Sequence, residues 1–433
     1  VEATRSPCGI RTDHANAIEN PMTKELEIDP NRLWKRLMQL AEIGATTNGG
    51  VNRQALTDGE HAAWRLITGW AAEAGLQSFT DPVANLFLVF PGTQRDLMPI
   101  LIGSHLDTQP TGGKFDGAFG VVAALEVAAT MSQRRVSPRR DVVVVSWMNE
   151  EGSRFAPGMM GSEAFGAHRS VEEIRVICDR DGISVGQEID RIHAAFGAIE
   201  RRELGFRPMA YIEPHIEQNT VLQSAASIIG CVTGIQGKKT FEITISGTKG
   251  HAGTLQMSQR RDAVLAFARF AAAAEQEMLS DNPDVKFTIG QLKVLPNAPS
   301  VIPEKVVFRV DLRHPDNDVL GSCAEKLKLL CARCCSPCAI SIEELVSAPS
   351  NTFDAALQRL ISQAAERRGV PFMPVISFAG HDARHLASLC PSAMIFIPCR
   401  DGISHDESEW AEPAHVAAGA QILLDVVNRL LAS

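Results

Sequence analysis

Short apolar runs that alternate with helical patterns constrain the fold of this chain more than any other feature. Apolar runs at residues 100–103 and 142–147 flank an alanine-rich helical pattern at residues 117–131. Fully apolar strands separated by helices are typical of a mostly parallel sheet that helices cover on both faces. We therefore predict an α/β domain in the first part of the chain.

The pattern changes after about residue 230 and returns near residue 350. In between, strand and helix patterns follow in the order strand 239–246, helix 258–278, strands 285–295 and 305–312, helix 317–334 and strand 339–345. This β-α-β-β-α-β order is the ferredoxin-like arrangement, which forms a complete small domain. We predict an α/β catalytic domain in two parts, 23–230 and 349–433, interrupted by an inserted α+β domain at 231–348.

Composition excludes several classes of protein. The chain has 433 residues, of which 45% are hydrophobic and 21% charged, and these are ordinary values for a globular protein of two or three domains. A net charge of -9 disfavours a nucleic-acid-binding protein, and no apolar run is long enough to span a membrane. Residues 1–22 are polar and patternless, and Met22 is a candidate native start, so we predict a disordered or non-native extension there.

The ten cysteines do not form a disulfide framework. In a chain of this length, their scattered use suits a reducing compartment, which predicts a cytoplasmic protein. Four cysteines, at positions 331, 334, 335 and 338, are grouped at helical spacing. A cysteine-only zinc site normally takes pairs from separate turns, so we interpret this group as a thiol-rich buried helix face.

Histidines and carboxylates gather in four segments, each of which follows a strand pattern. The segments are residues 103–117, 148–152, 214–219 and 404–407. Each alone has an ordinary explanation, such as a helix cap, a solvated acidic turn or a structural histidine. The four segments together indicate a functional site, because α/β sheets place their sites at the carboxyl ends of strands.

Five residues of these segments have side chains that bind divalent metal ions. They are His105, Asp116, Glu151, His215 and His405. Three imidazoles and two carboxylates suit Zn²⁺ and also Mn²⁺, Co²⁺ or Ni²⁺. If Asp116 bridges, two ions can each have three protein ligands, as in two-metal hydrolases.

Two further carboxylates lie beside these candidate ligands. Asp107 is two residues after His105 in an extended segment, so both side chains point to one side. The Asp107 carboxylate can then accept a hydrogen bond from the second ring nitrogen of His105 and fix its tautomer. Glu150 precedes Glu151 and can remain free as a general base.

Four motifs in combination resemble a known family. They are Gly-Gly-Lys-Phe-Asp-Gly at 112–117, Asn-Glu-Glu-Gly at 149–152, His-Ile-Glu-Gln at 215–218 and Gly-His-Asp-Ala at 380–383. With them the chain resembles the dinuclear-metal amidohydrolases that include N-carbamoyl-L-amino-acid hydrolase, allantoate amidohydrolase and yeast-type β-ureidopropionase. These are relatives of aminoacylase and the carboxypeptidase G-like metallopeptidases. The resemblance extends from about residue 30 to the C-terminus.

The resemblance implies roles for the candidate residues. It assigns His105 and Glu151 to different metal ions that Asp116 bridges, with His215 and His405 as the remaining ligands. It makes Glu150 the general base. It also implies a homodimer formed through the inserted domain, in which His251 reaches the partner's active site and polarises the scissile carbonyl.

The resemblance also implies a pocket for a substrate carboxylate. Gln218 matches a substrate-contacting glutamine, Arg313 matches the arginine that holds the carboxylate, and Gly380 belongs to the same pocket. An arginine is a suitable anchor because it can bind a carboxylate through two parallel hydrogen bonds.

Two positions depart from the family pattern. Ser300 stands where the family usually has an asparagine that helps Arg313, and Asn297 is close enough in sequence to compensate. Phe378 stands where the family usually has glycine, and its ring is expected to narrow the pocket. Both departures bear on which substrate is accepted and leave the candidate metal ligands unchanged.

We therefore predict a metal-dependent amidohydrolase that releases the amino acid, carbon dioxide and ammonia from N-carbamoyl-L-amino acids. Allantoate amidohydrolase and β-ureidopropionase are the nearest alternatives, followed by an aminoacylase or dipeptidase. A binding protein without turnover is disfavoured because all five ligands and Glu150 are present. The expected partners are a small-molecule carboxylate and a second copy of the chain, without nucleic acid or membrane.

Overall fold

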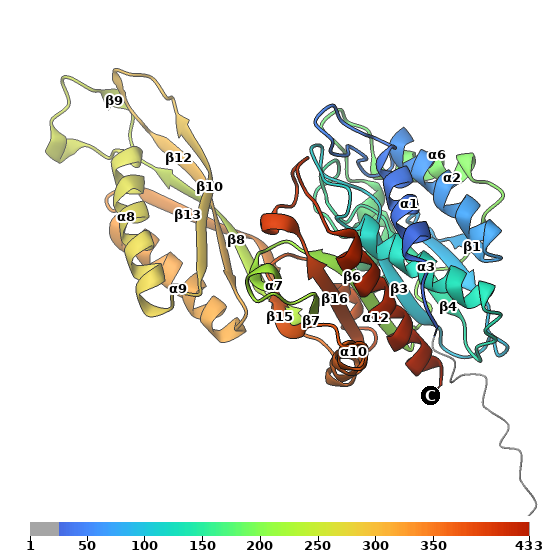
Figure 1. Cartoon of the computed structure of the whole chain (residues 1–433). Helices are drawn as coiled ribbons and strands as arrows, with labels where there is room; N and C mark the ends of the chain where they lie inside the picture. Colours follow the sequence, from blue (N-terminus) through green and yellow to red (C-terminus); the bar gives the residue numbers. More distant parts are fainter. Residues whose placement is uncertain (1–25, 433) are drawn as a thin grey trace, which may run out of the picture.

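The computed structural model describes residues 26–432, which form a large body and a smaller unit beside it (Figure 1). The predicted extension at residues 1–22 lies outside the described residues. Within the described range, no helix combines the length and the apolar character needed to cross a membrane.

A sheet of ten strands forms the centre of the large body. Its order is β14-β7-β16-β6-β3-β4-β2-β1-β5, and β15 pairs with β7. The strands are β1 (Gln77–Thr80), β2 (Leu86–Phe90), β3 (Ile100–His105), β4 (Val142–Trp147), β5 (Glu200–Arg201), β6 (Ala210–Glu217), β7 (Ile229–Ile235), β14 (Asn351–Thr352), β15 (Phe372–Ser377) and β16 (Ser392–Pro398). The central strands β4, β3, β6 and β16 are parallel, which confirms the predicted α/β class.

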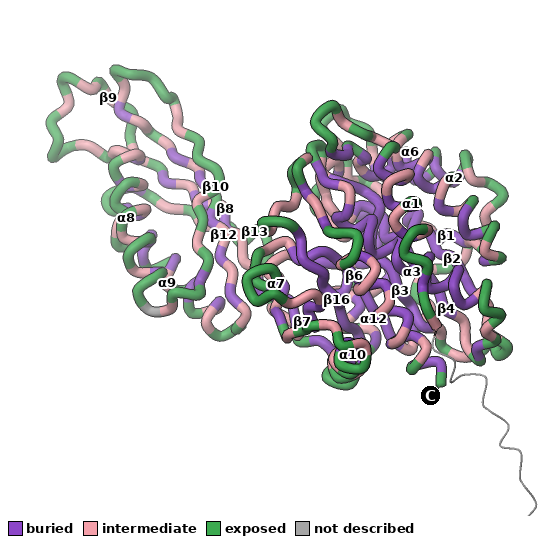
Figure 2. Tube along the Cα trace, in the orientation of Figure 1, coloured by how far each residue is buried: buried purple, intermediate pink, exposed green. Residues whose placement is uncertain are grey.

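Helices cover both faces of this sheet. On one face lie α1 (Pro30–Ala41), α2 (Asp58–Glu73), α3 (Ala118–Gln133), α10 (Ala355–Arg368) and α12 (Pro413–Leu431). On the other lies α11 (Ala383–Leu386), and α4 (Met160–Phe165) packs against it and contributes residues to both cores. Val142 and Val144 pack into one hydrophobic core, whereas Val143 and Val145 pack into the other. Figure 2 shows this buried interior in purple. Burial of both faces explains why β4 is apolar except at Ser146.

The connections between these elements contain short helices. They are α5 (Val171–Arg175), α6 (Val185–Ala195) and α7 (Val221–Ser224), with single 3-10 turns at Met257–Gln259 and Arg400–Gly402. Residues 169–206 contain α5, α6 and the short strand β5.

One glycine allows β3 and β4 to pair closely. Gly103 lies opposite Val145 and has a φ of +147°, and a Cβ there would lie 2.1 Å from the Val145 carbonyl oxygen. No other residue fits this approach without moving a central strand. Gly103 thereby fixes the position of His105, two residues further at the end of β3.

The smaller unit has its own sheet and core. Its strands β8 (Gly237–Ser246), β10 (Lys286–Leu295), β12 (Lys305–His314) and β13 (Ala339–Ala348) are antiparallel in the order β10-β12-β8-β13. The helices α8 (Ala263–Asp281) and α9 (Asn317–Cys334) pack against this sheet. This is the ferredoxin-like order that the sequence predicts. The predicted boundary at residue 231 lies within β7, and the smaller sheet begins at Gly237.

A two-stranded ribbon lies at the end of the smaller unit that is remote from the large sheet (Figure 1). It consists of β9 (Gly250–His251) and β11 (Val301–Ile302), which pair antiparallel. This ribbon has no counterpart among the predicted strands.

The grouped cysteines belong to the core of the smaller unit. Cys331, Cys335 and Cys338 are buried where α9 ends, and Cys334 is half-buried. Burial and the neighbouring cysteines raise the pKa of the Cys331 thiol to about 12, so it remains protonated at neutral pH. Among residues 26–432, no group of candidate metal ligands includes a cysteine. The interpretation as a thiol-rich buried face agrees with this packing.

We predict that Phe308→Ala destabilises the smaller unit by about 3–5 kcal/mol, because the phenyl ring is fully buried in its core. Hydrogen exchange should show lost protection in residues 237–348 and unchanged protection in β3, β4 and β6. Arg309→Ala is the matched control, since Arg309 is the next residue along β12 and is exposed. Equal loss of protection in both sheets would contradict a separate core.

Candidate active site

Five side chains from separate segments meet at one edge of the large sheet. His105 ends β3, His215 lies on β6, Glu151 follows β4, Asp116 precedes α3 and His405 follows β16. The parallel strands β3, β4, β6 and β16 all end at this edge. These five are the predicted metal ligands, and the fold brings them together where α/β sheets place their sites.

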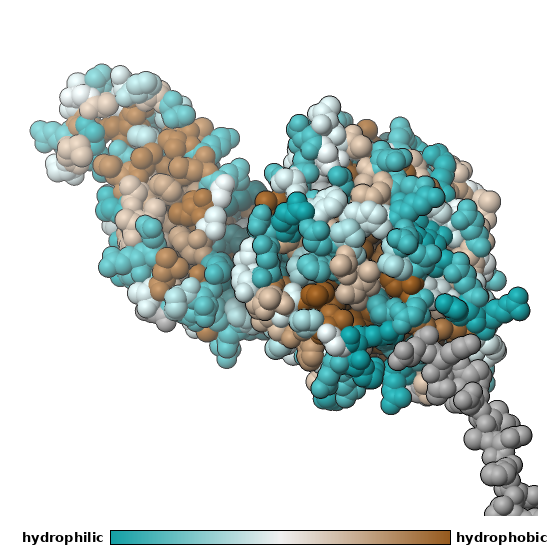
Figure 3. Space-filling view, in the orientation of Figure 1, coloured by the Kyte–Doolittle hydropathy of each residue, from teal (hydrophilic) through white to brown (hydrophobic). Residues whose placement is uncertain are grey.

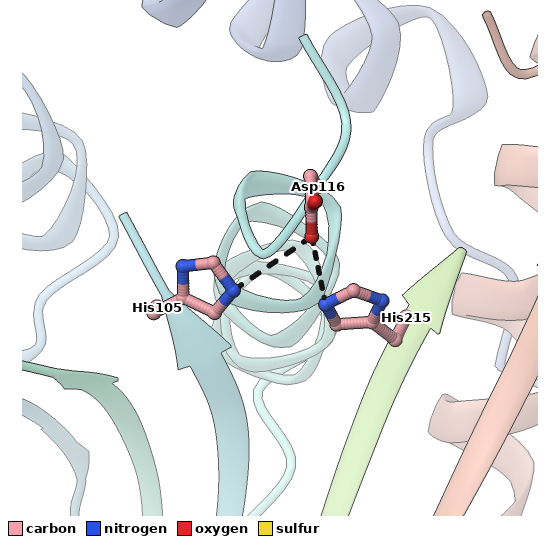
Figure 4. Close-up of side chains that lie close together, drawn as sticks. All are labelled: His105, Asp116 and His215. Atoms are coloured by element: carbon pink, nitrogen blue, oxygen red, sulfur yellow. Dashed lines mark ion pairs between the residues drawn. The ribbon is translucent and has the colours of Figure 1, made fainter. Parts of the chain in front are cut away.

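Asp116 lies between two groups of candidate ligands. In the first, its Oδ1 is 3.1 Å from His215 Nε2 and 3.8 Å from His105 Nε2, as Figure 4 shows. In the second, its Oδ2 is 3.3 Å from His405 Nε2, which is also 3.3 Å from Glu151 Oε2. Within each group the ligand atoms lie within 4.8 Å of one another. One oxygen of Asp116 thus faces each group.

The hydrogen bonds of the two buried imidazoles fit metal binding. Nδ1 of His105 is 3.0 Å from the Asp107 carbonyl oxygen, and Nδ1 of His215 is 3.0 Å from the Ile216 carbonyl oxygen. These acceptors assign the ring protons to Nδ1 and leave Nε2 as an acceptor. The amide of Gly117 donates to His215 Nε2, in agreement with this assignment. In the neutral rings, Nε2 therefore meets a carboxylate oxygen as acceptor against acceptor. A proton or a metal ion between the two atoms stabilises the contact.

The pKa values of two candidate ligands also indicate that the site favours positive charge. Burial lowers the pKa of His215, but the hydrogen bond to Asp116 and the charge of Asp116 outweigh burial and raise it. The hydrogen bond to Asp116 raises the pKa of His405 to about 9, partly opposed by burial. The site has a high affinity for positive charge, which metal ions of the kind predicted would supply.

Unusual backbone geometry occurs at three points of the site. Asn149, just before Glu150, and His405 have φ values of +54° and +58°, in the left-handed region that few non-glycine residues adopt. Gly117 has a φ of +61°, and a Cβ there would lie 2.3 Å from the His105 ring. Such conformations persist where surrounding contacts enforce them and are concentrated at functional sites.

Glu150 lies against the first ligand group, with its Oε2 3.5 Å from His105 Nε2. Burial raises the pKa of Glu150 well above its ordinary value; His105 opposes this, while the charges of Asp382, Glu151 and Asp107 add to it. A carboxyl group with a raised pKa can hold and release a proton near neutral pH, as a general base and acid must.

Asp107 has a different contact from the predicted one. The closest acceptor to His105 Nδ1 is the Asp107 carbonyl, whereas the carboxylate Oδ1 is 3.5 Å away. The carboxylate instead accepts hydrogen bonds from the amides of Glu150, at 3.2 Å, and Glu151, at 3.1 Å. The Asp107 carboxylate is bound to these two amides because the turn after β4 directs both N–H groups toward it. Asp107 therefore positions both glutamates and orients His105 through its backbone.

A cavity of about 1130 Å³ adjoins these residues and reaches the smaller unit. The predicted substrate residues Gln218, Arg313, Phe378 and Gly380 all line it. Gln218 Nε2 donates to Asp116 Oδ2 and to Ser404 Oγ, both at 3.0 Å. Arg313 Nη1 donates to the Phe378 carbonyl at 3.2 Å. Four of the six predicted substrate residues thus share one cavity with the candidate ligands.

The remaining predicted residues lie elsewhere in the chain. His251 is exposed on β9, opposite Val301 in the ribbon, and the amide of Ala252 donates to the Ser300 carbonyl. Ser300 and Asn297 are exposed in the same region. Arg313 is at the other end of β12, whose ten residues span roughly 30 Å. Within one chain, an extended strand separates Ser300 and Asn297 from Arg313, so their help to Arg313 stays a prediction that would need a second copy of the chain.

Glu409 is a site residue that the sequence did not reveal. It is 2% exposed, and its Oε1 accepts hydrogen bonds from the amides of Phe115, at 2.8 Å, and Asp116, at 3.1 Å. Its Oε2 contacts Ser404 Oγ at 3.1 Å, and Ser404 Oγ donates to Asp116 Oδ2 at 2.9 Å. Glu409 thus fixes the loop that carries Asp116. An acidic residue in a polar loop gives no sequence signal of such a role.

A second missed group lies behind His215. His381 packs edge-on against it, with ring centroids 4.4 Å apart, and Glu213 accepts hydrogen bonds from Ser104 Oγ and the Ala383 amide, both at 2.8 Å. Burial and the neighbouring His215 lower the pKa of His381 well below its ordinary value. The Gly-His-Asp-Ala motif at 380–383 therefore supports the ligand His215 from behind with a neutral ring.

Comparison with known proteins agrees with this geometry. The family described as peptidase family M20/M25/M40 matches residues 101–429. The N-carbamoyl-L-amino-acid amidohydrolase of Rhizobium meliloti is 40% identical over 403 residues, which cover 92% of this chain and 96% of that protein. The allantoate amidohydrolase of Bacillus subtilis (strain 168) is 31% identical over 407 residues, 92% of this chain and 97% of that protein. A hydantoinase/carbamoylase-family amidase from Burkholderia multivorans has a similar crystal structure, with a TM-score of 0.85, 39% identity and coverage of 94% of this chain and 99% of that one.

We predict that Glu409→Ala weakens metal binding roughly tenfold to a hundredfold, the range for residues that orient metal ligands. The amides of Phe115 and Asp116 lose their acceptor, so the Asp116 loop is no longer fixed. Metal titration followed by calorimetry measures the change. Glu409→Gln keeps a carbonyl acceptor and should retain most of the affinity. Glu407→Gln should retain all of it, because the half-buried Glu407 accepts from the Asn48 side chain and not from the Asp116 loop. Equal affinities in all variants would refute this role.

Proposed function

Because this chain belongs to peptidase family M20/M25/M40, a family of metal-dependent hydrolases, we propose that it hydrolyses N-carbamoyl-L-amino acids to the amino acid, carbon dioxide and ammonia. It is a hydrolase of amide C–N bonds, as relatives that match nearly its whole length are. The observation that carries the proposal is the carboxylate of Asp116 between two ligand groups, with Glu150 beside them and Arg313 in the same cavity.

The proposed cofactors are two divalent cations, with Zn²⁺ preferred and Mn²⁺, Co²⁺ or Ni²⁺ as alternatives. His105 and His215 would hold one ion, Glu151 and His405 the other, and Asp116 both. Divalent cations in such a site supply Lewis acidity and make water acidic enough to be a nucleophile near neutral pH.

Glu150 is the proposed general base. Its carboxylate accepts the proton of the attacking water as the oxygen adds to the carbamoyl carbon. It then donates this proton to the amino-acid nitrogen as the C–N bond breaks. The carbamate that remains decomposes to carbon dioxide and ammonia. The short separation between Glu150 and His105 keeps the base beside the reacting atoms.

Arg313 is the proposed anchor of the substrate carboxylate. Its Nε is bonded to Asp311 and its Nη1 to the Phe378 carbonyl, so the guanidinium is fixed at the cavity wall. Gln218 and Gly380 line the same cavity, and the Phe378 ring is expected to limit the size of accepted side chains. Allantoate is the alternative substrate, because allantoate amidohydrolases are also among the relatives.

The position of His251 supports the proposed homodimer. In its own chain, His251 lies on the ribbon that is remote from the large sheet (Figure 1), so only a partner's site is open to it. The edge strand β10 has unpaired backbone groups, and exposed apolar residues lie on α8, β10 and α9: Leu265, Leu279, Leu292 and Leu329. Figure 3 shows hydrophobic surface on this unit. Ser300 and Asn297 would enter the partner's site beside His251.

We predict that the metal-loaded enzyme releases ammonia from N-carbamoyl-L-amino acids and loses this activity after treatment with a chelator. Zn²⁺, Mn²⁺, Co²⁺ or Ni²⁺ should restore it. A panel of N-carbamoyl-L-amino acids, N-carbamoyl-β-alanine, allantoate and N-acetyl amino acids measures the choice of substrate. Fastest turnover of allantoate would replace the proposed substrate, and full activity in protein without metal by elemental analysis would exclude the proposed cofactors.

We predict that Glu150→Gln lowers turnover at least about a hundredfold, because the amide cannot accept a proton. Measured turnover equal to that of the wild type would contradict the role of Glu150.

We also predict that inactive His251→Ala mixed with inactive Glu150→Gln regains partial activity after subunit exchange. In the mixed dimer, one site has an intact Glu150 and receives an intact His251 from the other chain. The control is His168→Ala, which alters another histidine of the cavity: this variant carried through the same mixing procedure by itself should show no gain in activity. No recovery after confirmed exchange would contradict action across the interface.

A further inference from the structure

Arg384 is a cavity-lining cation that the proposed reaction does not use. It lies on α11, directly after the Gly-His-Asp-Ala motif, and lines the same cavity as Arg313 and the candidate ligands. Its Nη2 donates to the Gln236 carbonyl at 2.7 Å, while its Nε has no hydrogen-bond partner among the described residues.

The charge of Arg384 is not compensated. No described carboxylate lies within ion-pair distance of it, and Arg313 is the charged neighbour that influences it. Burial and Arg313 lower the pKa of Arg384 to about 10, and the group remains positively charged at neutral pH. A largely buried charge without a counterion costs free energy, which an anionic ligand would recover.

Other cations of the cavity wall are paired with carboxylates. Arg313 is paired with Asp311 at 2.8 Å, Lys238 with Asp311 at 3.2 Å, and Arg169 with Glu163 at 2.7 Å. Arg384 and Arg313 are linked through one short chain of contacts, because Gln236 and Arg313 both donate to the Phe378 carbonyl. Two guanidinium groups therefore flank the same part of the cavity, and one of them, Arg384, lacks a carboxylate partner.

We propose that Arg384 forms a second anion-binding subsite, so that the preferred substrates are N-carbamoyl amino acids with a side-chain carboxylate, of the N-carbamoylaspartate or N-carbamoylglutamate type. This inference rests on the proposed function and deepens it. Arg313 binds the α-carboxylate, and Arg384 binds the side-chain carboxylate. A hydrogen-bonded guanidinium is well suited to this, because its planar fork matches a carboxylate.

The test compares N-carbamoyl-L-glutamate with N-carbamoyl-L-glutamine, which has the same shape without the second charge. Wild-type kcat/KM should favour the glutamate compound by roughly tenfold to a hundredfold, the range for a hydrogen bond to a charged group. Arg384→Gln should remove this preference through a higher KM for the glutamate compound alone. Arg169→Gln is the matched control, since Arg169 lines the cavity but is paired with Glu163, and should keep the preference.

Two results would overturn the subsite. One is a wild-type enzyme without preference for the charged compound. The other is an Arg384→Gln variant that is impaired equally on both compounds, as expected if Arg384 only holds the Gln236 carbonyl. Equilibrium binding of both compounds to Glu150→Gln gives the same comparison without turnover. A binding preference without turnover of any N-carbamoyl compound would reject the proposed function and keep the subsite. Turnover of N-carbamoyl compounds without a binding preference would keep the proposed function and reject the subsite.

Discussion

The contact between Asp116 and the imidazoles of His105 and His215 is the constraint on which the rest of this structure depends. His105 and His215 direct their Nδ1 protons to backbone carbonyls, so Nε2 of each faces the carboxylate as an acceptor. A buried arrangement of this kind is stable only with positive charge between the partners. The fold holds it at the carboxyl edge of the central strands, where several loops converge.

Buried carboxylates that accept backbone amides keep these loops in place. Asp107 accepts the amides of Glu150 and Glu151, and Glu409 accepts those of Phe115 and Asp116. Each such carboxylate therefore fixes two residues of the site at once. The bonds from Asp107 hold the turn in which Asn149, just before Glu150, has a left-handed backbone.

The cavity belongs to both bodies of the molecule. The candidate ligands come from the large body, whereas Arg313 comes from β12 of the smaller unit, and Gln236 lies at the junction between β7 and β8. A substrate that bridges the ligands and Arg313 therefore contacts both sides of this junction. The ribbon with His251 lies at the opposite end of the smaller unit (Figure 1), so the proposed role of His251 requires a second copy of the chain.

The sequence by itself determined the elements with strong periodicity and the ligand types. Residues 142–147 and 317–334 were predicted with the bounds of β4 and α9, and the five candidate ligands were identified from motifs next to strand ends. The sequence predicted a strand pattern before His215 but gave no bounds for β6, because Glu213, Pro214 and His215 interrupt its apolar run. Only the tertiary structure decided which imidazole faces which oxygen of Asp116, that Glu409 holds its loop, and that β12 separates Ser300 from Arg313. Local patterns specify strands and helices through side-chain periodicity, whereas these contacts join separate elements, up to 294 positions apart for Glu409 and Phe115, and exist only once the chain is packed.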